Sequence, residues 1–330
     1  MFNKYLFIRD EKLLGEIITL IVSIILSVIY VALEISFKDN IISSILYITG
    51  FVLILYQFFS LGLFNNLRKR LDSTKILDRY IVIVFLGISF LLFSIASKAF
   101  DLYSFFILIF FLYALIESSK TVSRDNAWYD IFFITALWLI LDIRWYNDLW
   151  MEDKFSYTWW SLALSTIAIF VLQYIREIKN VNYTYYIKKE YVIDGLIFFI
   201  IGFPILSLPG VLLGFVQFPH YPSSGNVLEY ILVFIGIFIT IAVPEELVFR
   251  GTLYNLFEKK YGSKIALIFS SIVFGLTHWN NVSLLVHKII YVTLASIAGV
   301  IYCLAYKKSK SIMASALTHT LVDFVWRLFF

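Results

Sequence analysis

The feature that most constrains this chain is a series of apolar runs, each of about 20 residues, that recur along its whole length. A helix of that length spans the hydrocarbon core of a bilayer, where every backbone polar group must be satisfied within the protein. Composition agrees, because 61% of the residues are hydrophobic and 15% are charged, whereas soluble domains carry about 25% charged residues. We therefore predict an all-α fold, a polytopic transmembrane helix bundle.

Eleven segments are apolar enough to be predicted as membrane spans. They are residues 13–37, 41–64, 80–99, 103–119, 128–144, 157–175, 192–215, 227–249, 265–279, 284–306 and 311–329. The first apolar stretch follows Lys4, Arg9 and Lys12, as in a signal peptide, but no small-residue cleavage site closes it. We therefore expect an uncleaved first membrane helix.

Lysine and arginine are concentrated in every second predicted connection, which indicates an orientation. The basic set comprises the N-terminus and residues 65–79, 120–127, 176–191, 250–264 and 307–310. The intervening segment 145–156 is acidic, and 216–226 has no lysine or arginine. Because cytoplasmic loops carry the excess of positive charge, we expect a cytoplasmic N-terminus and an external C-terminus, in the plasma membrane of a bacterium or archaeon.

Titratable residues are distributed unevenly among the predicted spans. They are nearly absent from the centres of the spans before residue 190 and frequent after it. We therefore expect an N-terminal membrane region of about six helices at 1–190 and a second region at 191–330 that carries the chemistry. Cys303 is the single cysteine, so no intrachain disulfide is possible. The chain has no Gly-rich phosphate loop, cysteine metal cluster or nucleic-acid motif, so no nucleic-acid partner is expected.

The segment that begins at Pro244 contains the first candidate site residues. Proline is tolerated at the start of a helix and kinks a helix interior, so we expect it to start or kink a helix that carries Glu245, Glu246 and Arg250. At a spacing of four residues, Glu246 and Arg250 lie on one helical face and can pair, while Glu245 points to another face. The two adjacent glutamates are therefore predicted to have different roles.

Two later segments place further polar side chains on apolar helices. Phe274 and His278 are four residues apart, and so are His319 and Asp323, so each pair shares a helical face. Glu245 and His278 each lie fourteen residues from a lysine beside the basic turn, which is about 21 Å along a helix. His319 and Asp323 rise roughly 14 and 20 Å from the basic turn before their own helix. Residues from three helices are thus predicted at similar depths.

Burial of these charges in lipid is costly unless they interact. An ionised side chain near the bilayer centre costs on the order of 3 kcal/mol, so Glu245, Glu246, Arg250 and Asp323 cost on the order of 10 kcal/mol together. They must face one another, water or a metal. A polar network that only fixes helix packing is the simpler alternative, but two histidines and three carboxylates exceed what packing needs.

The three segments resemble the motifs of the CPBP family, also called Abi or CAAX-protease-like membrane proteases. The family pattern is Glu-Glu-x-x-x-Arg, Phe-x-x-x-His and His-x-x-x-Asn or Asp, found here at 245–250, 274–278 and 319–323. The resemblance covers about residues 192–330, and the motifs stand in order on successive apolar helices. It implies a C-terminal CPBP-type catalytic core. The implied activity is that of an intramembrane endopeptidase, acting on membrane-associated protein or peptide substrates of CAAX or bacteriocin-like type.

The resemblance also implies a role for each residue. In such enzymes the first glutamate and the first histidine activate the water that attacks the scissile carbonyl, and these would be Glu245 and His278. The second histidine, by position His319, would stabilise the oxyanion. Glu246 and Arg250 would orient the site or hold substrate.

Asp323 is the position whose role the sequence leaves open. Where relatives have asparagine, the amide can donate a hydrogen bond to the oxyanion, which an ionised aspartate cannot do. Asp323 could be protonated, could orient His319 or could ligate a metal. Glu245, His278, His319 and Asp323 together suit a divalent metal such as zinc, and a metal-free glutamate mechanism is the alternative.

Two functions other than proteolysis are compatible with buried polar residues in membrane helices. One is a non-catalytic membrane scaffold or receptor. The other is a proton-coupled transporter, since buried carboxylates and histidines also form proton relays, although no inverted repeat is evident. The signatures of other intramembrane proteases, His-Glu-x-x-His, Gly-x-Ser-Gly and Gly-x-Gly-Asp, are absent. We therefore predict an intramembrane protease of the CPBP type.

Overall fold

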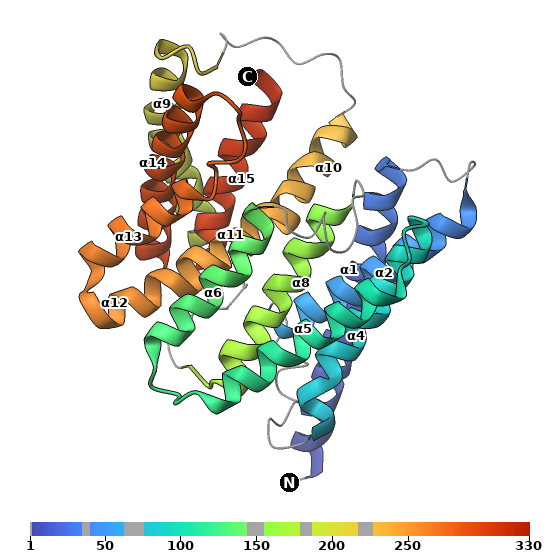
Figure 1. The fold of residues 1–330 in the computed structure, drawn as a ribbon. Coiled ribbons are helices and arrows are strands. Elements are labelled where there is room, and N and C mark those ends of the chain that lie inside the picture. Colours follow the sequence, from blue (N-terminus) through green and yellow to red (C-terminus); the bar gives the residue numbers. More distant parts are fainter. Residues whose placement is uncertain (1, 35–39, 63–75, 144–154, 179–186, 217–226) are drawn as a thin grey trace. The chain divides into compact units, whose positions relative to one another are not determined.

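The computed structural model describes residues 2–34, 40–62, 76–143, 155–178, 187–216 and 227–330 (Figure 1). All regular structure in these residues is helical, and every segment predicted as a span coincides with a helix or a continuous helical stretch. Seven helices of the described chain are long and apolar enough to cross a membrane by length and composition. The prediction of an all-α, polytopic membrane helix bundle is therefore confirmed, and the chain is a multi-pass integral membrane protein.

Two compact units divide the chain. The first comprises residues 1–126 and 144–179, and the second comprises residues 127–143 and 180–330. The separate role expected for residues 1–190 stays a prediction. The predicted orientation of the chain in the membrane also stays a prediction. Large parts of four predicted connections lie outside the described residues: 65–79, 145–156, 176–191 and 216–226.

The first unit is a bundle with an aromatic interior. Its helices are α1 (Phe2–Glu34), α2 (Ile41–Leu61), α4 (Ile76–Ala96), α5 (Leu102–Thr121) and α8 (Ser156–Phe170), with α8 continued by the π-helical turn η1 (Val171–Ile175). Helix α2 packs against α1, α4 and α8, and α4 packs against α5. The ring of Phe155 contacts those of Tyr30, Tyr47, Phe51 and Phe93.

Arg176 of the first unit differs from the prediction of a basic loop over 176–191. It is 1% exposed and donates hydrogen bonds to the backbone carbonyls of Ser119, Val122 and Ser123 at the end of α5. The last carbonyls of a helix have no partner within the helix. Arg176 therefore acts as a cap for α5 inside the unit, and it is not a solvated loop cation.

The second unit contains the candidate site. Its elements are α6 (Ala127–Asp142), α9 (Lys189–Leu212), α10 (Val227–Ile237), η2 (Phe238–Ala242), α11 (Val243–Glu246), η3 (Leu247–Tyr254), α12 (Asn255–Tyr261), α13 (Ser263–Leu276), α14 (Leu285–Ser309) and α15 (Ile312–Phe329). Helix α9 packs against α14 and α15, α13 packs against α14, and α10, η2 and α11 pack against α15 (Figure 1). Helix α6 contacts η3 and α12.

The helix predicted over 227–249 is longer than expected. Helical structure continues over the 35 residues 227–261 and ends at Gly262, whose φ of 81° is readily adopted only by glycine. Two π-helical stretches, η2 and η3, flank the short helix α11, and such insertions are frequent at functional sites. Arg250, counted with the basic connection 250–264, therefore lies inside a helix, and the true turn is confined to the region of Gly262.

Helices α13 and α14 approach each other closely because glycines face the contact. A Cβ atom on Gly299 of α14 would lie 3.0 Å from Cα of Ser271 on α13. A Cβ atom on Gly275 of α13 would meet the Ser296 hydroxyl and would lie 2.6 Å from the Val292 carbonyl oxygen. Small residues allow backbones of membrane helices to pack in this way. The contact sets how near the end of α13 lies to the middle of α14.

Substitution of Gly275 by alanine is expected to force these two helices apart. The added methyl group meets backbone atoms that cannot rotate away, so we expect a loss of about 1–3 kcal/mol in the free energy of unfolding. Thermal unfolding of the purified protein in detergent measures the change. The control is Gly236→Ala on α10, where nothing lies within 4 Å of the added Cβ. Equal stability of the two variants would contradict the close contact.

Candidate active site

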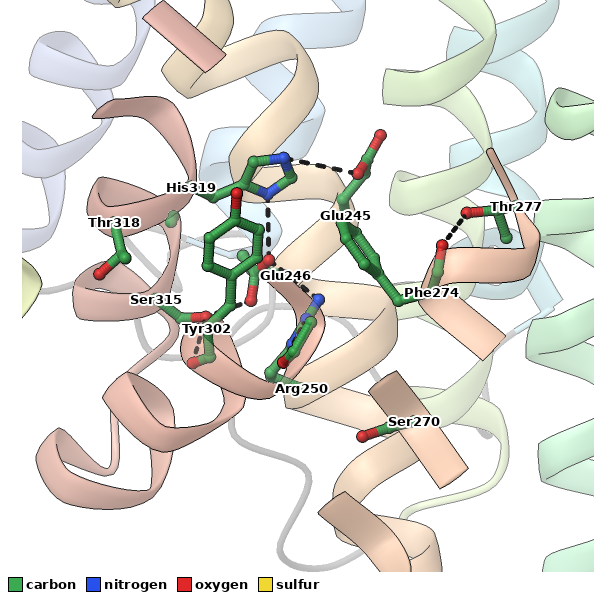
Figure 2. Close-up of polar contacts among 12 residues, drawn as sticks. Glu245, Glu246, Arg250, Ser270, Phe274, Thr277, Tyr302, Ser315, Thr318 and His319 are labelled. Atoms are coloured by element: carbon green, nitrogen blue, oxygen red, sulfur yellow. Dashed lines mark hydrogen bonds and ion pairs between the residues drawn. The ribbon is translucent and has the colours of Figure 1, made fainter. Parts of the chain in front are cut away.

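The structure brings the predicted residues of the α11–η3 stretch together with those of α15. Figure 2 shows Glu245, Glu246 and Arg250 on one side and His319 on the other, with interactions between them. Glu246 and Arg250 are fully buried, and Glu245 and His319 are 7% and 2% exposed. Such burial of polar groups is tolerated when each has a partner.

The predicted pair of Glu246 and Arg250 is confirmed. Nη1 of Arg250 donates to Oε1 of Glu246 at 2.9 Å, and Nη2 donates to the backbone carbonyl of Gly299 on α14 at 3.0 Å. The guanidinium also lies over the rings of Phe274 and Tyr302, at 4.5 and 5.4 Å from their centroids. Aromatic faces attract a cation, so Arg250 joins η3 to both α13 and α14.

His319 is the residue that connects the carboxylates. Its Nδ1 lies 3.0 Å from Oε1 of Glu246, and its Nε2 lies 3.3 Å from Oδ2 of Asp323 and 3.8 Å from Oε2 of Glu245. An ionised carboxylate has no hydrogen to donate and can only accept hydrogen bonds. Glu246 therefore fixes a proton on Nδ1 and directs Nε2 toward the other two carboxylates.

Asp323 and His319 share a helical face, as the spacing predicts, and the distance between them confirms it. The side chain of Asp323 is 37% exposed, in contrast to the 9% of Glu245. Asp323 therefore lies at the accessible edge of the cluster, and Glu245 lies deeper beside the same nitrogen of His319.

His278 is placed differently from the other predicted residues. It lies in the turn after α13, where Nδ1 bonds the Phe274 carbonyl at 2.9 Å and the ring lies 5.2 Å from that of Tyr291. Because a carbonyl only accepts, Nδ1 carries the hydrogen and the neutral ring keeps its lone pair on Nε2. Within the described residues, no hydrogen bond joins His278 to Glu245; the histidine nearest to that carboxylate is His319.

The geometry of the cluster bears on the predicted metal site. Among the described residues, no group of three or more histidine, cysteine, aspartate or glutamate side chains has a geometry that could hold a metal ion. Nδ1 of His319 is bound to Glu246 and Nδ1 of His278 is bound to a carbonyl, so Nε2 is the nitrogen of each ring that could face a ligand. Glu245, His278, His319 and Asp323 therefore do not form such a group in the described structure.

Two residues of the cluster were not identified from the sequence. The hydroxyl of Ser315 contacts the Glu246 carboxylate and lies 2.9 Å from the backbone carbonyl of Tyr302. The ring of Tyr302 is stacked on that of His319, with centroids 4.6 Å apart and an angle of 18°. Ser315 stands one helical turn before His319 and could have been found from that spacing. Tyr302 has no comparable signal, because it is one of 22 tyrosines in the chain.

Fold and site together define a polytopic membrane protein with a carboxylate–histidine cluster buried among its C-terminal helices. Residues 227–325 match the family model described as Type II CAAX prenyl endopeptidase Rce1-like. This segment begins at α10, ends within α15 and contains all six predicted site residues. It is thus an Rce1-like domain, and the resemblance to the CPBP family is confirmed. The family consists of proteases. No curated protein and no solved structure matches the chain.

Removal of the Arg250 side chain is expected to destabilise the protein strongly. Arg250→Ala leaves Glu246 buried without its cation, and breaking such a pair costs about 3–5 kcal/mol. Thermal or denaturant unfolding in detergent measures the loss. The control is Arg124→Ala, which breaks a pair with Glu177 whose side chains are 59% and 51% exposed; an exposed pair contributes about 1 kcal/mol or less. A loss for Arg250→Ala as small as that of the control would refute a stabilising buried pair.

Proposed function

We propose that this chain is an intramembrane endopeptidase that hydrolyses a peptide bond of a membrane-associated substrate with a water activated by glutamate and histidine. The observation that carries the proposal is the position of His319, which bonds Glu246 through one nitrogen and faces Glu245 and Asp323 with the other. Such a cluster lies within the segment that matches a protease family. A general base, a donor and an orienting partner are the parts that peptide hydrolysis requires.

In the first step Glu245 acts as the general base. A water between its carboxylate and the scissile carbonyl gives a proton to Glu245, and the resulting hydroxide forms a bond to the carbonyl carbon. The carbonyl electron pair moves onto oxygen, which becomes an oxyanion. His278 supports this step in the proposal, because its Nε2 lone pair can accept a hydrogen bond from the same water.

The oxyanion is stabilised by His319 in the second step. A proton on Nε2 of His319 is donated as a hydrogen bond to the oxyanion, while Glu246 holds Nδ1 and Asp323 orients the ring from the next helical turn. The oxyanion then re-forms the carbonyl and the carbon–nitrogen bond breaks. The proton taken up by Glu245 passes to the departing amine nitrogen, so the products are a carboxyl group and an amine.

Glu246 and Arg250 orient the site in this proposal. Both are fully buried and lack exposed surface for substrate, and their bonds reach His319 and Gly299. Preorganised groups of this kind keep a donor aimed at the position where charge develops. Of the two roles considered for Glu246 and Arg250, these contacts favour orienting the site over holding substrate.

The proposed substrate is a membrane-associated protein or peptide. The description of the matched family indicates a CAAX-type substrate, in which a prenylated cysteine is followed by three residues at the C-terminus. Bacteriocin-like or other membrane-associated peptides are the further class. The basic connections support a cytoplasmic N-terminus, and the expected location is a bacterial or archaeal plasma membrane.

Replacement of Glu245 by glutamine is expected to abolish cleavage while the protein stays folded. The amide has almost the same shape but cannot take a proton from water, so kcat should fall by about 10²–10⁴. The assay uses an internally quenched peptide with an S-farnesyl cysteine followed by three residues, with the enzyme in proteoliposomes.

The control for this experiment is Glu229→Gln. Glu229 is an exposed carboxylate in the first turn of α10, so its substitution should leave cleavage unchanged. Full activity of the Glu245 variant would remove the proposed role of Glu245 as the base, whereas absence of cleavage by the native protein would favour a scaffold or a proton-coupled transporter.

A further inference from the structure

Tyr302 on α14 combines burial with a hydroxyl that has no hydrogen-bond partner among the described residues. The residue is 1% exposed, yet its hydroxyl oxygen is not fully enclosed. No hydrogen bond to this oxygen occurs among the described residues. The oxygen therefore keeps a small accessible surface beside the cluster. Figure 2 shows the hydroxyl directed away from Ser315 and toward the end of the site that holds the His319 ring.

The neighbours of Tyr302 hold its ring rigidly. It is stacked on His319 at 4.6 Å, meets the ring of Phe274 edge-on at 5.8 Å and lies beneath the Arg250 guanidinium. Its backbone carbonyl is bound by Ser315. A donor fixed in this way needs no reorganisation when charge develops near it.

The cluster is rich in acceptors, and the donors of Arg250 are either occupied or fully enclosed. Arg250 uses Nη1 and Nη2 on Glu246 and Gly299, and its Nε is fully enclosed without a partner. His319 uses Nδ1 on Glu246, and its Nε2 is shared by Asp323 and Glu245. An ionised Asp323 offers only acceptors. Beside the Nε2 proton of His319, the Tyr302 hydroxyl is therefore a second donor for a substrate oxygen.

We propose that Tyr302 is a further catalytic residue, whose hydroxyl donates a hydrogen bond to the oxyanion formed on the scissile carbonyl, beside His319. This inference rests on the proposed endopeptidase function. The hydroxyl keeps its proton throughout, since it supplies a hydrogen bond and takes no part in proton transfer. Tyr302 thereby provides the donation that Asp323 does not provide when ionised.

The test is the variant Tyr302→Phe, which retains the stacked ring and removes only the hydroxyl. With the farnesylated quenched peptide and the enzyme in proteoliposomes, kcat is expected to fall by about 10²-fold, the usual effect of losing one oxyanion donor. KM should stay within about twofold, because the interaction forms only in the transition state. The melting temperature in detergent should not change, since the hydroxyl makes no hydrogen bond within the described part of the chain.

The matched control is Tyr306→Phe. Tyr306 lies one turn further along α14, and its hydroxyl bonds the Asn255 side chain outside the cluster, so kcat should stay near that of the native protein. The Glu245→Gln variant, assayed in parallel, separates the two proposals.

Three outcomes would overturn the role of Tyr302. One is an unchanged kcat for Tyr302→Phe in a preparation whose Glu245→Gln variant is inactive; this removes the inference and leaves the proposed function standing. The second is a raised KM at constant kcat, which indicates ground-state binding. The third is a fall in melting temperature parallel to the loss of activity, which indicates a structural hydroxyl. Cleavage by Glu245→Gln overturns both proposals together.

Discussion

The buried contact between Glu246 and Arg250 is the interaction on which the rest of the site depends. Neither side chain has any exposed surface, and a charge placed in a membrane interior without a partner is costly. Further contacts of the pair offset this cost. The guanidinium binds a carbonyl on α14, and the carboxylate binds His319 and Ser315 on α15. The contacts that compensate the buried charges are therefore the same contacts that position the residues of the site. Loss of Glu246 removes the anchor of His319, and loss of Arg250 leaves that anchor buried without its cation.

The two adjacent glutamates have different tasks because the helix directs them to different neighbours. Glu246 lies in the fully enclosed network, whereas Glu245 faces the second nitrogen of His319 from a position with slight exposure. The π-helical stretches on both sides of α11 change the angular spacing in this part of the helix. In the proposed mechanism one glutamate holds the histidine and the other exchanges protons with water, which requires separate environments for two chemically identical groups.

The helices were predictable because long apolar runs in lipid have few structural solutions, and the Glu246–Arg250 and His319–Asp323 pairs followed from a four-residue spacing. The extension of helix to Tyr261 was not predictable, since charged residues lower its apolar character and π-helical turns have no recognisable pattern. The contact of His319 with Glu246 depends on how α15 packs against α11, which periodicity within one helix does not contain. For the same reason the contact of Tyr302 on α14 with His319 could not be predicted. Ser315 could have been predicted, because it lies four residues before His319 on the same helical face.

Helix α14 reaches the site only because glycine and serine let it lie against α13. It then supplies a carbonyl for Arg250 and the ring beneath His319. No single helix therefore carries a complete set of groups, and the histidine has neither its anchor nor its stacking partner until separate helices have associated. On the proposed function, a chain whose helices have not yet associated therefore lacks a complete active site, and activity arises only with the assembled bundle.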